Sequence, residues 1–191
     1  VFAYCYGLVN VTVNSTEIGE YMFQGCKNLE SVIISDSVTV IGKGAFIECE
    51  KLETINIPSS VITINNMAFL NCNSLESIII PGSIETLDRA FKSCKGLKNV
   101  IIEEGVEEIV SGALYKCTAL EEISLPKSLS KIGGLALGDC STLKKINYAS
   151  TVEEWDAIDK DSGWHRRTPE DCQIICVDGI ILMDGTVLPL E

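Results

Sequence analysis

The chain has 191 residues, of which 46% are hydrophobic, and it carries a formal net charge of −12 at pH 7. This apolar content is sufficient for a continuous core, yet no stretch approaches the roughly 20 apolar residues that a membrane span requires. An excess of acidic side chains repels phosphate backbones, so we expect no nucleic-acid partner.

A short pattern, a cysteine followed three residues later by a leucine, recurs from Cys5 to Leu143. Its seven cysteines are Cys5, Cys26, Cys49, Cys72, Cys94, Cys117 and Cys140. Successive cysteine numbers differ by 21, 23, 23, 22, 23 and 23, a period typical of solenoids that are built from stacked rungs. One rung cannot bury its apolar residues alone, so its stability has to come from neighbouring rungs. A globular enzyme fold is therefore not expected.

Each rung contains one segment with the alternation of a β-strand. In the third rung Leu52, Ile55 and Ile57 have this spacing, and Pro58 ends the strand because it has no backbone N–H. Equivalent segments run from Leu8 to Val13 in the first rung and from Leu143 to Asn147 in the last. We expect these segments to form one parallel sheet with one strand per rung, with short helical or irregular turns opposite.

Two rungs are shorter than the others. The turn after Val13 lacks the proline and part of the second apolar pair, and the segment 87–91 is one residue shorter than the segment 41–46. Both deletions lie outside the strand segment of the rung. We therefore expect the strand face to stay regular while the opposite side varies.

The cysteines are expected to remain free thiols. Equivalent positions on successive rungs place seven of them in a column, with about 4.8 Å between neighbours. Parallel Cα–Cβ bonds in such a column do not converge as a disulfide or a tetrahedral zinc site requires. Cys172 and Cys176 lie four residues apart in a predicted strand, roughly 13 Å, so they cannot bridge each other. Either one could still pair with another cysteine.

The segment 149–191 is predicted to cap the solenoid, whose last core face would otherwise meet water. Thr151 and Glu154 form a capping box at the start of a short helix. The segments 172–177 and 180–183 are predicted to form a β-hairpin around Asp178-Gly179. Trp155 and Trp164 are expected to seal the core, and a tryptophan-lined ligand site is the alternative.

The repeat string C-x-x-L-x-x-I-x-I-P-x-S-V-x-x-I-x-x-x-A-F-x-x-C resembles the BspA-like leucine-rich repeats from Val1 to about Tyr148. The tail, with Trp155, Trp164 and Cys176-Val-Asp-Gly179, is similar to the segment that closes such repeats in surface proteins of anaerobic Gram-positive bacteria. The resemblance implies a right-handed leucine-rich-repeat β-solenoid over residues 1–148, with seven rungs of which the first is truncated, and a cap over residues 149–191. It also implies export to the cell surface or secretion and a role in adhesion or protein binding, although residues 1–191 contain no recognisable export signal.

Catalytic and metal-binding patterns are weak. His165 is the only histidine, and a cysteine hydrolase built on His165 and Cys172 would also need an orienting group and an oxyanion site. Asp159, Asp161 and Glu170 faintly resemble a calcium loop, but Trp164 stands where such a loop requires glycine. The sequence therefore predicts no enzyme, no catalytic residues, no cofactor and no metal.

A partner-binding surface is predicted on the outer face of the strands. There the outward residues form two columns, and one of them contains Ile33, Asn56, Ile79 and Ile101. Glu53 and Glu76 lie near the strand starts. An apolar strip with an acidic margin would suit a basic or amphipathic segment of a protein. The alternatives are that isoleucine suits any strand, exposed or not, and that the solenoid is a structural spacer or stalk for another domain.

Overall fold

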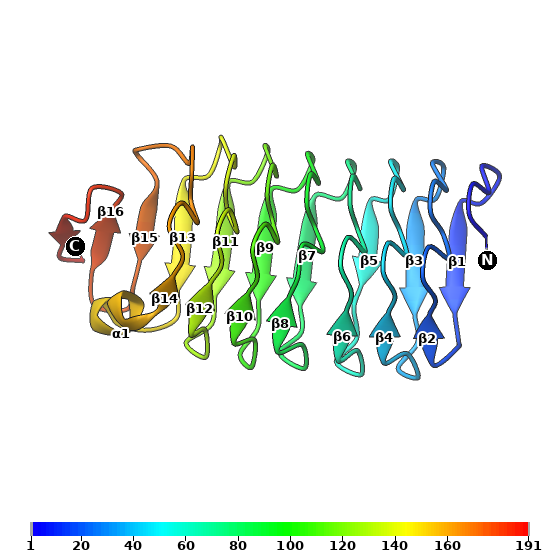
Figure 1. The fold of residues 1–191 in the computed structure, drawn as a ribbon, viewed down its shortest axis with the longest axis horizontal. Coiled ribbons are helices and arrows are strands. Elements are labelled where there is room, and N and C mark those ends of the chain that lie inside the picture. Colours follow the sequence, from blue (N-terminus) through cyan, green and yellow to red (C-terminus); the bar gives the residue numbers. More distant parts are fainter. Residues whose placement is uncertain (1, 191) are drawn as a thin grey trace.

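The computed structural model describes residues 2–190, and these form an elongated stack of turns with the two chain ends at opposite ends of the stack (Figure 1). One side of each turn is a short strand, and at all but one of the junctions in this row adjacent strands pair in parallel. These strands are β1 (Asn10–Val13), β3 (Ser31–Ile34), β5 (Thr54–Asn56), β7 (Ser77–Ile80), β9 (Asn99–Ile102), β11 (Glu122–Leu125), β13 (Lys145–Tyr148) and β15 (Gln173–Ile175). The predicted leucine-rich-repeat β-solenoid is confirmed.

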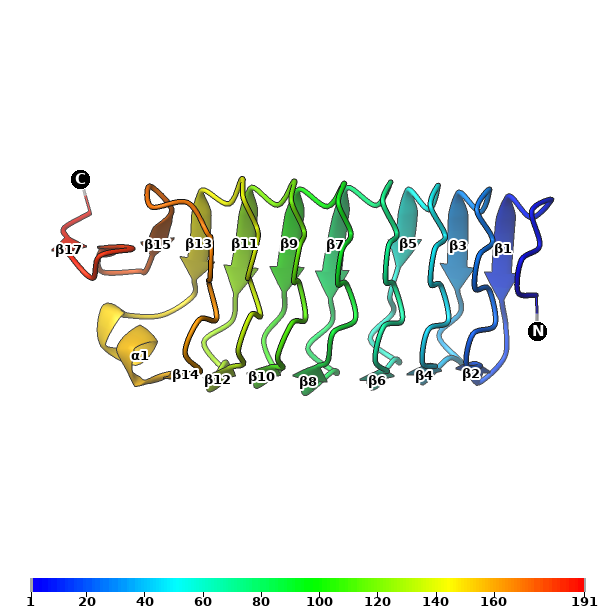
Figure 2. The ribbon, with the colours of Figure 1, turned by 45° about the horizontal axis from the view of Figure 1, so that its top comes forward.

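A second row of strands lies where helical or irregular turns were expected (Figure 2). Each of these strands has two residues. They are β2 (Glu17–Ile18), β4 (Val40–Ile41), β6 (Thr63–Ile64), β8 (Thr86–Leu87), β10 (Glu108–Ile109), β12 (Lys131–Ile132) and β14 (Asp159–Lys160). These short strands add to the turns that were expected there. They form because the isoleucine or leucine at this position is buried in successive rungs and must therefore stack in register.

A third side closes each turn, and we call it the phenylalanine side, made by residues 19–25, 42–48, 65–71, 88–93, 110–116, 133–139 and 161–167. Phe23, Phe46, Phe69 and Phe91 stack along it, with ring centroids 5.3, 5.2 and 4.9 Å apart. Backbone N–H groups on this side donate to the next rung, for example from Phe46 to Ala68 at 2.7 Å. The buried Leu, Ile and Cys columns lie inside these three sides and form one continuous core.

The last strand of the repeat ends one residue later than expected. The sequence predicted that this segment ends at Asn147, but β13 extends to Tyr148, which pairs with Leu125 and is only 4% exposed. Tyr148 therefore belongs to the core column, and its ring contacts Trp155 edge to face at 5.4 Å between centroids.

The C-terminal segment covers the stack and also continues it. Helix α1 (Val152–Ala157) begins at Thr151, whose hydroxyl accepts a hydrogen bond from the Glu154 N–H at 3.2 Å. Trp155 and Trp164 are buried, as expected of residues that seal a core. β14 pairs with β12, and β15 pairs with β13, so stacking extends past residue 148. The predicted hairpin is present as β15 and β16 (Ile180–Leu182), and β17 (Val187–Leu188) adds an antiparallel edge. Val1 and Glu191, the outer ends of the two predicted segments, lie outside the described residues.

The strand face is interrupted at one place, contrary to the expectation that it stays regular. β5 does not pair with β7, and in the second row β6 does not pair with β8. Figure 2 shows the wider spacing of the ribbons at this junction. The phenylalanine side remains joined there, because the Phe69 N–H donates to the Ala90 carbonyl at 2.9 Å. We call the interruption between β5 and β7 the split.

Candidate binding surface

The outward residues of the strands are exposed as the alternation predicted. Ile33, Ile79 and Ile101 are 63%, 49% and 46% exposed, while their strand neighbours Val32 and Ile78 are buried. Ile79 and Ile101 lie opposite each other in the ladder between β7 and β9. Ile33 lies opposite the polar Asn56 and on the far side of the split. The predicted apolar strip is therefore two separate patches.

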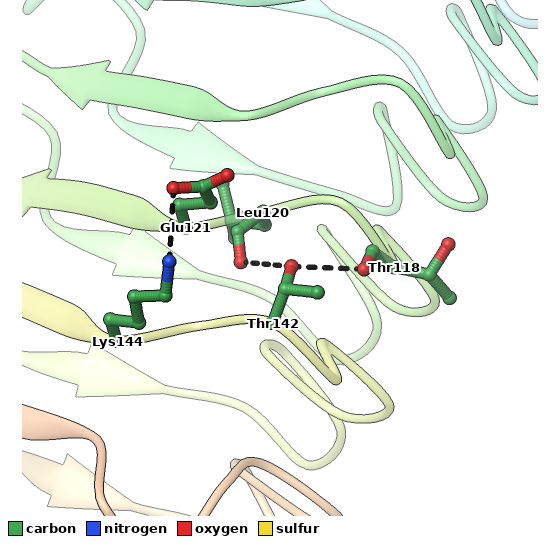
Figure 3. Close-up of polar contacts among 5 residues, drawn as sticks. All are labelled: Thr118, Leu120, Glu121, Thr142 and Lys144. Atoms are coloured by element: carbon green, nitrogen blue, oxygen red, sulfur yellow. Dashed lines mark hydrogen bonds and ion pairs between the residues drawn. The ribbon is translucent and has the colours of Figure 1, made fainter.

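The margin at the strand starts has both signs of charge, so the expectation of an acidic margin is corrected. Lys98 Nζ lies 2.7 Å from Glu76 Oε1, and Lys144 Nζ lies 3.3 Å from Glu121 Oε2 (Figure 3). Exposed pairs such as these contribute at most about 1 kcal/mol to stability. Their effect is to neutralise Glu76 and Glu121. Among residues 2–190, Glu30 and Glu53 have no basic side chain within 4 Å, so the acidic part of the margin lies beside β3 and β5.

The half of the face that follows the split is tied together by side chains. The Thr142 hydroxyl lies 2.9 Å from the carbonyl oxygens of both Thr118 and Leu120, one rung earlier (Figure 3). With the Glu121–Lys144 pair beside it, this contact links the last two repeat rungs. At these last two rungs the margin of the face is polar and internally bonded.

Two depressions meet at the split. One, of about 310 Å³, is lined among others by Ile33, Glu53, Asn56 and Ser77. The other, of about 680 Å³, is lined among others by Glu53, Glu76, Ser77 and Lys98. Four of the six predicted binding residues, Ile33, Glu53, Asn56 and Glu76, therefore line this hollow. Ile79 and Ile101 lie outside it.

The buried thiols of the cysteine column are poor nucleophiles. All nine cysteines are free, which confirms the prediction for the column, and only Cys5 is exposed. Burial raises the pKa of the Cys94 and Cys140 thiols to about 12, so both are protonated at neutral pH. The Cys72 Sγ also lies 3.2 Å from the Phe46 carbonyl of the preceding rung, a contact that sequence spacing does not reveal.

The weak catalytic and calcium patterns take part in structural contacts. The His165 ring packs edge to face on Trp164 at 4.5 Å, and partial burial lowers the pKa of His165. Cys172 is buried, which raises its pKa to about 12. The Asp161 carboxylate accepts a hydrogen bond from the Gly134 N–H at 3.1 Å. Within residues 2–190 no group of three or more His, Cys, Asp or Glu side chains is arranged to hold a metal.

Comparison with known proteins gives the same architecture. The family model described as the BspA type Leucine rich repeat region, in 6 copies, matches residues 1–89 and 87–158. The chain is similar to a leucine rich cell surface protein from Faecalibacterium prausnitzii, with 26% identity and a TM-score of 0.54. It is also similar to a leucine-rich repeat protein from T. pallidum, with 28% identity and a TM-score of 0.70, and to one from Eubacterium ventriosum, with 26% and 0.72.

The three matches cover 85%, 85% and 84% of this chain and 65%, 79% and 43% of those structures, in the same order. The chain therefore spans less than two thirds of the proteins from F. prausnitzii and E. ventriosum. No curated protein sequence matches it significantly. In the described part of the chain, no helix has the length and apolar character needed to span a membrane. Leucine-rich repeats of this kind generally act as surface or protein-interaction modules.

Proposed function

Because this chain belongs to the BspA-type leucine-rich repeat family, we propose that it is a non-enzymatic protein-binding or adhesion module. Its partner is a protein of a host or of a neighbouring cell, bound through the strand face. A rigid stack of rungs offers a long repeated surface to such a partner. The proposed location is the bacterial cell surface or the secreted fraction, since the similar protein from F. prausnitzii is described as a cell surface protein.

The observation that carries this proposal is the presence, among residues 2–190, of exposed apolar side chains and unpaired carboxylates on the strand face. Ile33, Ile79 and Ile101 are 63%, 49% and 46% exposed, and Ile33 lines a hollow that has an acidic edge at Glu53. A structural spacer does not require apolar side chains that are exposed to solvent. Exposed apolar patches with a polar rim are, in contrast, typical of protein-interaction sites. The six residues proposed to contact the partner are Ile33, Glu53, Asn56, Glu76, Ile79 and Ile101.

A structural spacer or stalk is the second candidate. The rungs from β11 onward favour it, because their outward residues Glu122, Ser124, Lys145 and Asn147 are polar. Such a surface contributes length and solubility without a preferred partner.

The two candidates are separated by a pull-down from extracellular host proteins with the immobilised chain. The partner that is recovered should bind the double variant Ile79→Ser, Ile101→Ser at least about tenfold more weakly, because both substitutions remove apolar area from the face. Ile62→Ser is the matched control, since Ile62 is 59% exposed but its N–H donates to the Thr39 carbonyl beside the second row of strands, away from the strand face. If the double variant bound with unchanged affinity, the strand face would not be the site. The search would then move to the cap loop around residues 164–167.

A further inference from the structure

The split coincides with a one-residue deletion in the fourth rung. From Leu87 to Ala90 the chain has two intervening residues, whereas three separate Ile41 from Ala45 in the second rung. At complete rungs the N–H of Gly44 and of Gly112 donates to the next rung, but the equivalent Met67 N–H has no such bond within residues 2–190. On the phenylalanine side of this junction, Phe69 and Phe91 have the closest ring spacing of the column, 4.9 Å. On the other two sides of the junction, the strands of the third and fourth rungs are not paired: β5 does not pair with β7, and β6 does not pair with β8.

The open junction leaves backbone groups unpaired on the strand face. At the next junction the N–H groups of Lys98 and Asn99 donate to the Glu76 carbonyl at 2.8 and 3.2 Å. At the junction before, Glu53 and Thr54 donate in the same way to Glu30 at 3.0 and 3.4 Å. For the part of the chain that is described, Glu76 and Ser77 make no such bond to Glu53. By the alternation of a parallel ladder, the N–H and C=O groups of Ile55, Ser77 and Ile79 point into the split.

We infer that the split is the anchor point of the proposed protein partner, which enters it as an extended basic segment and pairs with β5 and β7 through its backbone. This inference rests on the proposed function and specifies its mode. Free backbone groups of a sheet edge are the usual template for an added strand. The side chains beside the split favour lysine or arginine that alternates with apolar residues, because among residues 2–190 Glu30 and Glu53 have no basic side chain within 4 Å, while Ile33 and Ile79 are exposed.

Insertion requires the split to widen. A strand between β5 and β7 needs about 10 Å, twice the ordinary strand spacing. Some Cα atoms of β5 and β7 lie within 8 Å of each other. The phenylalanine side keeps the bonds from Phe69 to Ala90 and from Asn71 to Lys92 at this junction and therefore acts as the hinge.

The first test needs no ligand and measures amide hydrogen exchange by NMR. The amides of Ser77 and Ile79 should exchange at least about tenfold faster than those of Asn99 and Ile101, their equivalents one rung later, because unpaired amides lack ladder protection. Insertion of one glycine between Asp88 and Arg89 restores the rung length and should remove this difference. A glycine inserted after Gly185, in the exposed turn of the cap, is the matched control and should change nothing. If Ser77 and Ile79 were as protected as Asn99 and Ile101, the inference would be overturned.

The second test uses the synthetic peptide acetyl-Lys-Val-Lys-Val-Lys-Val-amide as the probe. It should slow exchange at Ser77 and Ile79, and the Asp88–Arg89 insertion should weaken binding at least tenfold while the Gly185 insertion does not. An analogue with N-methylated valines should fail to bind, since it has lost backbone donors but kept its charge. Equal binding of the N-methylated peptide, equal binding to the Asp88–Arg89 insertion variant, or no binding at millimolar concentration would each overturn the inference.

Binding of the pull-down partner to the two variants distinguishes this inference from the proposed function. Loss of binding in the Ile79→Ser, Ile101→Ser variant together with full binding in the Asp88–Arg89 insertion variant would leave the strand face as the site and exclude the split as its anchor. Loss of binding in both variants supports both statements. Full binding in both variants would overturn both.

Discussion

The Cys72 Sγ lies 3.2 Å from the backbone carbonyl of Phe46, and Cys49, Cys94 and Cys117 make the same contact with the preceding rung at 3.0 to 3.2 Å. Each buried thiol is therefore a weak hydrogen-bond donor with a fixed acceptor as well as a small apolar group. The spacing of the sequence indicates only the apolar role.

This contact sets the expected effect of Cys72→Ser. The sequence alone predicts a cost of about 1 to 3 kcal/mol from a buried hydroxyl without a partner. Because the Phe46 carbonyl is within reach, we expect the lower end of that range, about 1 kcal/mol, in the free energy of unfolding measured with urea. Cys72→Ala, which removes the donor, is the control. A loss above about 3 kcal/mol for the serine variant would show that the hydroxyl finds no acceptor.

Reducing agents should leave the stability unchanged. All nine cysteines are free, so dithiothreitol has no bond to break. The thermal midpoint should be the same with and without the reductant. A marked fall in the midpoint on reduction would contradict the free-thiol column.

Alkaline pH should destabilise the fold through the buried thiols. Burial raises the pKa of Cys94 to about 12, whereas an unfolded cysteine titrates near about 8.5. Between these values the unfolded chain loses a proton that the folded chain keeps, so stability that is complete below the unfolded pKa declines as pH rises. The slope is up to about 1.4 kcal/mol per pH unit for each thiol. Urea titrations from pH 8 to pH 11 should show a flatter decline for Cys94→Ala, and parallel curves would show that this thiol does not contribute.

Truncation of Trp155 should destabilise the cap end. Trp155 is buried and contacts both Tyr148 and Trp164 edge to face, so Trp155→Ala leaves a large void over the last core layer. We expect a loss of about 3 to 5 kcal/mol in chemical denaturation. Val177→Ala, at an exposed position in the same cap, should change the free energy by less than about 0.5 kcal/mol. Similar losses for the two variants would argue against a sealing role for Trp155.

The architecture could be predicted from the sequence because the same residue types recur at each rung. Leu52, Ile55 and Ile57 in one rung have counterparts in the others, so the strand row and the buried columns follow from periodicity. The two-residue strands of the second row carry too few residues to show an alternation of their own. Tyr148 was missed because a polar-tipped aromatic residue replaces the usual isoleucine or leucine at the last inward position.

The candidate site was predictable in part. The alternation of residues along the strands correctly predicted that Ile33, Ile79 and Ile101 are exposed. The pairing of Glu76 with Lys98 was missed, although the two residues occupy the same repeat position one rung apart, and an alignment of the rungs would have indicated it. The split was not predictable from local patterns. The deletion that coincides with it lies at residues 87–90, on another side of the rung, whereas the missing pairing is between β5 and β7.

The split also divides the stack mechanically. Backbone bonds between rungs run along the long axis of the molecule, so a pull on the two ends loads every junction in series. At most junctions all three sides share that load, whereas between the third and fourth rungs only the phenylalanine side bears it. Under tension the solenoid therefore parts first at this junction, into one block that ends with β6 and another that begins with β7.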